Sequence, residues 1–248
     1  MRRRFCPALV LSGLLLVSPG AARAEAVVAD LSSHLIAITT GFTGTSVVLF
    51  GATDGPGDVI AVVRGPERDV TLWRKAKFAG IWANAEAVTF TNVPSFYAVA
   101  ASRPPDELLA PAAAALYRIG SGNLKLQAVT DVTEERYRLF REALIGTQQR
   151  AGVFAAATGK IAFLGERLFR TTISFPANVP TGTYLVEVFV VRDKDVVGAQ
   201  TTPLVVSKVG IDAAVFDFAR DRSLAYGAIA VMMAVVAGWC ASLPFRNG

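Results

Sequence analysis

A basic and aromatic segment is the part of this sequence best suited to binding chemistry. It covers residues 68–82 and reads RDVTLWRKAKFAGIW. Its bases and tryptophans are Arg68, Trp73, Arg74, Lys75, Lys77 and Trp82. Because guanidinium groups bind oxyanions and aromatic rings give rigid contact area, the segment suits an anion or a partner's acidic surface. The alternative is a basic edge strand whose tryptophans fill the core, since lysines also protect sheet edges.

Residues for familiar catalytic constellations are scarce. The sequence has one histidine, His34, and two cysteines, Cys6 and Cys240. A zinc site or a Cys–His pair needs more such groups close together. Neither a G-x-S-x-G nor a Walker A motif occurs, and residues 120–122 (GSG) lack the spacing of a dinucleotide loop. We therefore expect a protein that is not an enzyme, with no catalytic residue, metal or cofactor; an unrecognised hydrolase is a third alternative.

The first 24 residues have the pattern of a secretory signal peptide. Arginines at positions 2–4 precede an apolar run over residues 8–17, and Ala22-Arg23-Ala24 supplies an A-x-A cleavage site before Glu25. The apolar run is too short to span a bilayer, which takes about 20 residues. Cys6 should leave with the signal.

The opposite end of the chain predicts a transmembrane helix over residues 223–243. Leu224 to Leu243 is free of charged residues and would be about 30 Å long as a helix, the thickness of the hydrocarbon core. Tyr226 and Trp239 lie near its ends, where amphipathic rings favour the membrane interface. We expect a juxtamembrane segment at 211–222 and a cytoplasmic tail at 244–248. A cleaved signal and one span predict a single-pass inner-membrane protein with a periplasmic domain.

Small residues recur every four positions along this helix, at Ala230, Ala234, Gly238 and Ser242. They fall on one face, and small residues allow two helices to approach closely in lipid. This face predicts packing against another membrane helix, while a passive anchor is the alternative.

Composition argues against a nucleic-acid partner. The formal charge is +5 with 25 bases and 20 acids, but four arginines lie in the signal region. The mature chain is therefore close to neutral, whereas nucleic-acid binding needs a basic surface.

Short β-branched and aromatic runs predict a mainly β fold. In the first β region, residues 25–102, strands are expected at 35–39, 46–50, 59–63, 70–73, 87–91 and 96–100. The short spacing and the Gly/Pro turns favour an antiparallel Ig-like β-sandwich. A helical insert at 103–152 should hold helices at 106–117 and 133–149, the second with Leu139, Phe140 and Leu144 on one face.

A second β region, residues 153–210, should contain strands at 161–164, 168–175, 183–191 and 196–207. Residues 192–195 are expected to form a polar hairpin turn, and Tyr184 to anchor a sandwich corner. These strands could complete the first sandwich or form a second lobe; the sequence is interpreted as two lobes.

Several long runs of the mature chain carry a family resemblance. They are GFTGTSVVLFG, DVIAVVRGP, WRKAKFAGIWANAEAVTFTNVPSFYAVAASRP, LFRTTISFPANVPTGTYLVEVFVVRDKDVVGAQTTPLVVSKVG and the closing apolar stretch. They resemble the alphaproteobacterial transmembrane protein family of unknown function (Alph_Pro_TM). The resemblance implies membrane anchoring, supplies no catalytic residues, and suggests an association with sulfite-exporter-like permeases.

Together these observations predict a non-catalytic accessory or interaction subunit of a membrane complex, such as a permease. Its expected partners are the lipid bilayer and a multi-span membrane protein. The alternative function is a periplasmic anion-binding or sensing module that uses residues 68–82.

Overall fold

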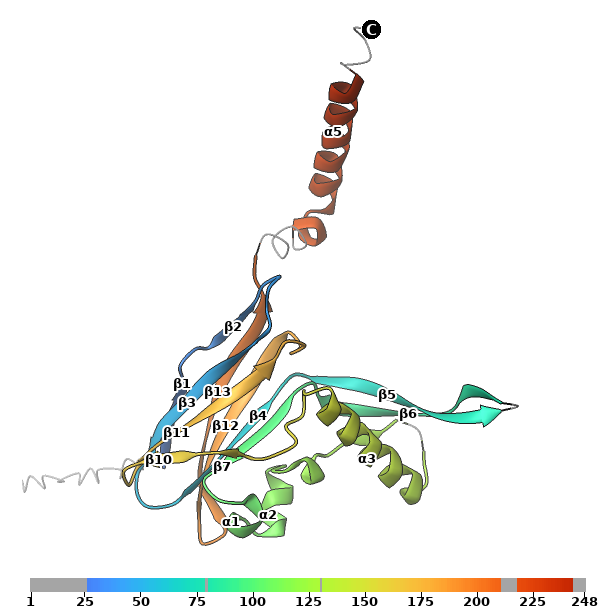
Figure 1. Cartoon of the computed structure of the whole chain (residues 1–248). Coiled ribbons are helices and arrows are strands. Elements are labelled where there is room, and N and C mark those ends of the chain that lie inside the picture. Colours follow the sequence, from blue (N-terminus) through green and yellow to red (C-terminus); the bar gives the residue numbers. More distant parts are fainter. Residues whose placement is uncertain (1–25, 79, 130, 211–217, 243–248) are drawn as a thin grey trace, which may run out of the picture.

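Two β-sheets form the body of the protein (Figure 1). The computed structural model describes residues 26–78, 80–129, 131–210 and 218–242. Sheet A has the order β1-β3-β11-β10 and sheet B the order β2-β13-β12-β4-β7-β9. The signal peptide and the cytoplasmic tail expected from the sequence lie outside the described residues, as does most of the juxtamembrane segment.

Both sheets mix strands from the two β regions expected from the sequence. Sheet A consists of β1 (Val27–Leu31), β3 (Gly44–Thr53), β11 (Leu168–Pro176) and β10 (Ala162–Leu164). Sheet B consists of β2 (Leu35–Ile38), β13 (Asp195–Lys208), β12 (Gly182–Arg192), β4 (Asp58–Arg64), β7 (Tyr97–Ala101) and β9 (Gly159–Lys160). The expectation of two lobes is therefore wrong, because β3 pairs with β11 and β4 pairs with β12.

Most of the pairing is antiparallel, as expected, with two exceptions. β13 pairs in parallel with β2, and β7 pairs in parallel with β9. In each case the parallel partner, β2 or β9, is a short strand at an edge of sheet B. β1 was missing from the expected strands, although it pairs with β3 along its whole length.

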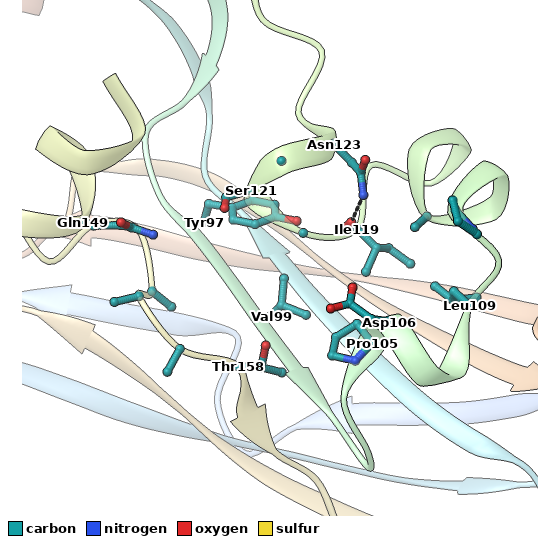
Figure 2. A pocket seen from close by; sticks show the side chains of 17 residues that line it. Tyr97, Val99, Pro105, Asp106, Leu109, Ile119, Ser121, Asn123, Gln149 and Thr158 are labelled. Atoms are coloured by element: carbon teal, nitrogen blue, oxygen red, sulfur yellow. Dashed lines mark hydrogen bonds between the residues drawn. The ribbon is translucent and has the colours of Figure 1, made fainter. Parts of the chain in front are cut away.

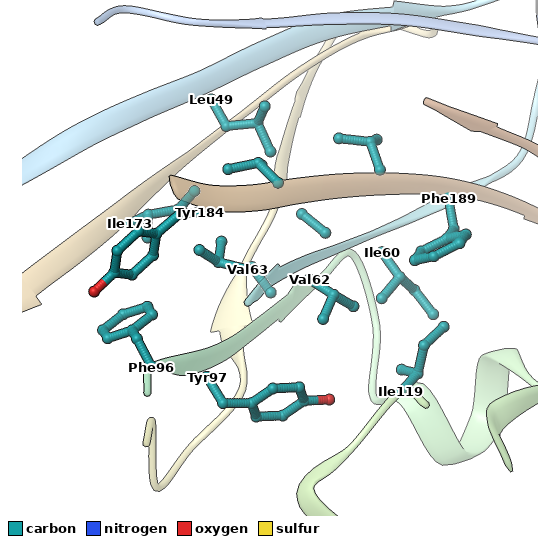
Figure 3. Close-up of a cluster of buried hydrophobic side chains, with 14 of the residues drawn as sticks. Leu49, Ile60, Val62, Val63, Phe96, Tyr97, Ile119, Ile173, Tyr184 and Phe189 are labelled. Carbon is teal, nitrogen blue, oxygen red and sulfur yellow. The ribbon is translucent and has the colours of Figure 1, made fainter. Parts of the chain in front are cut away.

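Sheet B is buried on both faces at β4, which explains the unbroken apolar run of this strand. All residues from Val59 to Val63 are buried, whereas a sheet with one solvated face would show alternation. In Figure 3, Val63 lies on the side of Leu49 and Ile173 from sheet A, and Val62 and Ile60 lie on the side of Ile119. The helical insert therefore covers the face that sheet A leaves open.

Aromatic rings close the sandwich at one corner. Phe96 stacks on Phe175 of β11 with 5.0 Å between ring centroids, and Tyr184 of β12 lies 5.8 Å from Phe96. The Tyr184 hydroxyl donates to the carbonyl oxygen of Pro180 at 2.6 Å. The structure thus confirms Tyr184 as the corner anchor.

A third sheet projects from the body as a long hairpin, here called the arm (Figure 1). It is made of β5 (Glu67–Phe78) and β6 (Ile81–Pro94), and the short β8 (Gln127–Ala128) pairs with β6 near the body. Val88 and Phe90 are fully buried, whereas the described side chains beyond Glu86 toward the tip are not. The arm therefore has a packed stem and a solvated outer half.

The helical insert contains α1 (Pro105–Leu108), α2 (Pro111–Leu116), the 3-10 turn η1 (Ser121–Asn123) and α3 (Glu134–Arg150). The single helix expected at 106–117 is broken at Pro111, because proline lacks an N–H and disfavours helix at the residue before it. α3 agrees with expectation except for its buried face. Phe140, Leu144 and Gln148 are buried, whereas Leu139 is exposed.

The last described element is α5 (Ser223–Ser242), a helix whose side chains are exposed as far as Trp239. Within the described part of the chain, no helix satisfies both the length and the apolarity needed to cross a membrane. The expected helix is therefore present, but the span predicted at 223–243 is not established by it.

Candidate functional site

The arm brings four residues of the basic and aromatic segment onto one face. In β5, Trp73, Lys75 and Lys77 alternate in sequence, so they project to the same side of the strand. Trp82 of β6 lies directly opposite Lys77 and shares that side. We call these four residues the arm face.

The tryptophans of the arm face do not fill a core. Trp73 is 57% exposed and Trp82 is 67% exposed. The segment does form an edge strand, β5, as the alternative interpretation expected, but the expectation that its tryptophans fill the core is wrong. The reason is tertiary: nothing in the described chain packs against this side of the hairpin's outer half.

Arg74 lies on the opposite side of the arm. Its guanidinium donates to the carboxylate of Glu86 at 2.7 Å, and Arg136 of α3 lies 3.1 Å from the other carboxylate oxygen. The hydrogen bond from Arg74, with the charge of Arg136, lowers the pKa of Glu86. Arg74 thus contributes, through Glu86, to the link between the arm and α3. Its guanidinium is engaged in this pair, so it is less available to a ligand than Lys75 and Lys77 are.

Arg68 is also separated from the arm face. It lies opposite Val93 near the body, and an irregularity in the ladder follows it before Val70. The structure therefore brings together four of the six residues singled out in the sequence, and it assigns Arg68 and Arg74 to other surroundings.

Asn84, Ala87 and Thr89 lie on this side of the arm, opposite Lys75, Trp73 and Thr71 respectively. Between Thr71 and the tip, no carboxylate is among the described residues of this side; Asp69 follows in the alternation of β5, nearer the body. The arm face is thus locally positive, since its ionisable groups are the two lysines. Exposed tryptophan beside exposed lysine can contact a flat apolar surface and attract acidic groups around it.

A partly buried ion pair fastens the insert at the base of the arm, and sequence reasoning missed it. Arg64 of β4 pairs with Glu187 of β12, and its guanidinium also donates to the carbonyl oxygen of Tyr117 at 2.7 Å. Burial lowers the pKa of Arg64. This arrangement joins neighbouring strands to the end of α2 and has a structural role.

A cavity of about 580 Å³ lies between sheet B and the insert (Figure 2). Tyr97 and Val99 of β7 form part of its wall, and the rest comes from α1, α2, η1, the end of α3 and residues 155–158. No pattern in the sequence predicted this cavity, because its walls come from segments far apart in the chain.

His34 lies outside both sites. Its Nε2 is 2.8 Å from a carboxylate oxygen of Asp30, and both side chains are about half exposed. Among the residues that the structure describes, no group of three or more His, Cys, Asp or Glu side chains is placed to hold a metal ion.

These features define a β-sandwich protein with a projecting hairpin arm and a C-terminal apolar helix. The chain belongs to the family described as "Putative transmembrane protein (Alph_Pro_TM)", which matches residues 26–247. Neither the curated proteins nor the solved structures include a significant match to it.

Proposed function

We propose that this protein is a non-catalytic, single-span inner-membrane protein that acts as an interaction subunit of a membrane complex, such as a permease. The observation that carries the proposal is the arm face. Exposing the large apolar surface of a tryptophan to water is unfavourable in free energy, and tryptophan is enriched where proteins bind one another. Two such residues on one face of a projecting hairpin favour a protein partner.

The membrane anchor in this proposal is the apolar stretch from Leu224 to Leu243. It carries no charge over 20 residues and continues beyond the described helix to Leu243. Exposed apolar side chains surround α5, among them Val231, Met232 and Val235. Such a helix, apolar on all sides, is suited to lipid, and membership of a family labelled transmembrane supports the same assignment.

The charge of the arm face indicates the chemistry of the partner. Lys75 and Lys77 flank the tryptophan pair, so an acidic rim around an apolar patch would complement them. Electrostatic attraction of this kind weakens with salt, because exposed charges are screened over about 8 Å at physiological ionic strength.

Copurification of the full chain in mild detergent tests the proposal. Trp73→Ala with Trp82→Ala should reduce recovery of a multi-span partner at least tenfold, because tryptophan hot spots are worth about 2 kcal/mol or more. The control is Val28→Ala with Leu168→Ala, which removes two comparably exposed apolar side chains from sheet A. Equal recovery with the tryptophan variant and the unmodified chain would refute the role of the arm.

Anion binding or sensing is the second candidate, and the paired lysines favour it. Lys75→Gln with Lys77→Gln should then abolish binding of sulfate to the purified full chain, measured by calorimetry. If the protein binds no sulfate while the tryptophan variant loses its partner, the interaction role stands alone.

A further inference from the structure

The cavity between sheet B and the insert carries a separate inference. We propose that it binds a small organic cation, a primary ammonium group on a short aliphatic body. This site is distinct from the arm face and does not depend on the function proposed for the arm.

Charge is the first argument. Asp106 of α1 lines the cavity, and no lysine, arginine or histidine is among the described residues that line it. Two bases of neighbouring segments have other partners: Arg103 pairs with Asp58, and Arg141 donates to the carbonyl oxygens of Ser121 and Gly122. The cavity therefore disfavours an anion and suits a neutral or positive group.

Unused hydrogen-bonding groups are the second argument. Figure 2 shows the carboxylate of Asp106 and the hydroxyl of Thr158 on either side of Val99, while the amide of Gln149 lies farther along the cavity, beyond Tyr97. Asp106 and Thr158 are exposed residues. None of these three side chains has a hydrogen bond or ion pair with another described residue. An ammonium group has three donors and no acceptor, so the carboxylate of Asp106 and the hydroxyl of Thr158 can each accept one hydrogen bond, and water can accept the third.

The aliphatic lining is the third argument. Val99, Leu109 and Ile119 supply apolar walls, and Ala155 and Ala157 line both this cavity and a second one of about 290 Å³. The second cavity reaches small apolar residues of sheet B, including Ala61 and Ala98. A short alkyl chain would thus contact apolar surface on several sides, while its charged end stays at Asp106.

Tyr97 limits how polar the ligand can be. Its hydroxyl already donates to the carbonyl oxygen of Arg118 at 2.9 Å, so it can only accept a further hydrogen bond. The cavity also lacks an aromatic cage of the kind that selects quaternary ammonium groups. A primary amine with an aliphatic body fits this donor and acceptor pattern better than a polyol or a quaternary ammonium.

The test is an NMR titration of the full chain in nonionic detergent with n-butylammonium, using butanoate and n-butanol as probes of equal length. We expect saturable binding of butylammonium, with butanoate and butanol at least tenfold weaker. In the series from ethyl- to butylammonium, affinity should rise by up to about fourfold for each added methylene that becomes buried. The same titration into micelles without protein measures how much of each probe partitions into the detergent.

Two matched variants locate the site. Asp106→Asn should weaken butylammonium binding about tenfold, because a hydrogen bond to a charged group is lost. Glu107→Gln removes the neighbouring carboxylate, which does not line the cavity, and should leave binding unchanged. Thermal unfolding of both variants checks that they fold. Butanoate binding as tightly as butylammonium, equal effects of the two variants, or no saturable binding would each overturn the proposal.

Discussion

At the scale of single residues, two buried phenols hold different parts of the molecule together. Tyr97 donates to the carbonyl oxygen of Arg118 and so joins sheet B to the insert, while Tyr184 donates to Pro180 within the sandwich corner. Both rings are almost fully buried. Burial raises the pKa of each hydroxyl to about 12.

These raised pKa values predict a loss of stability at alkaline pH. An unfolded tyrosine titrates near pH 10, so ionisation is easier in the unfolded chain. The stabilisation is complete below about pH 10 and is lost as the pH rises from about 10 to 12, by roughly 2 kcal/mol per tyrosine. Urea unfolding across this range measures it.

The double variant Tyr97→Phe with Tyr184→Phe provides the comparison. It should be less stable at pH 7, because two hydrogen bonds of about 1 kcal/mol each are lost. Its free energy of unfolding should then change less than that of the unmodified chain between pH 10 and 12. An identical pH dependence in both proteins would contradict the burial of these phenols.

At the scale of elements, the arm and α5 share one property: large apolar side chains lie on them without a covering layer. The stem of the arm is held by α3, where Tyr137 lies 5.7 Å from the ring of Phe90. The outer half relies on its own ladder, and an isolated hairpin is only marginally stable in water. An element of this kind is suited to becoming more ordered when a partner binds to it.

The small-residue face of α5 predicts that larger side chains there will weaken packing against a partner helix. Ala234→Leu with Gly238→Leu should lower partner recovery several-fold without reducing membrane insertion, because leucine keeps helices apart and adds no charge. A Cβ at Gly238 meets no atom of the described chain within 4 Å, so the substitution is sterically free in the protein alone. Copurification and membrane fractionation measure the two effects.

Val231→Leu with Val235→Leu is the control on a different face of the helix. It should leave both insertion and recovery unchanged. If the two pairs of substitutions behave alike, α5 acts as an anchor and the partner contacts lie in the β-sandwich or the arm.

At the scale of the whole molecule, each sheet of the sandwich contains strands from both β regions. β3 is bounded by β1 and β11, and β4 lies between β12 and β7. The chain therefore has to close the long loop across the insert before either sheet is complete. Non-local pairing of this kind makes the two β regions depend on each other.

This dependence predicts that a fragment of residues 26–104 will not fold by itself. Without β11 and β12, the apolar faces of β3 and β4 would be exposed to water. We expect an amide NMR spectrum without dispersion and no cooperative unfolding, whereas residues 26–210 should show both. Adding a fragment of residues 105–210 should restore dispersion, and a fragment 26–104 that unfolds cooperatively would contradict the shared sandwich.

Local chemistry in the sequence was sufficient for much of the secondary structure. The polar hairpin at 192–195 is confirmed, and Asp193 and Lys194 have φ values of 51° and 66°, as a two-residue hairpin turn requires. The positions of most longer strands and of α3 also follow from local patterns, because alternation and helical spacing are properties of neighbouring residues; β1 is an exception.

Tertiary structure alone decided which strands pair and which side chains are buried. A local pattern shows that Trp73 and Lys75 share a side of a strand, but the layer that covers that side comes from elsewhere in the chain. For the same reason, the sequence predicted two lobes where β3 and β11 share one sheet. The cavity beside Asp106 likewise depends on segments distant in sequence, since its shape is set by how the insert packs on sheet B.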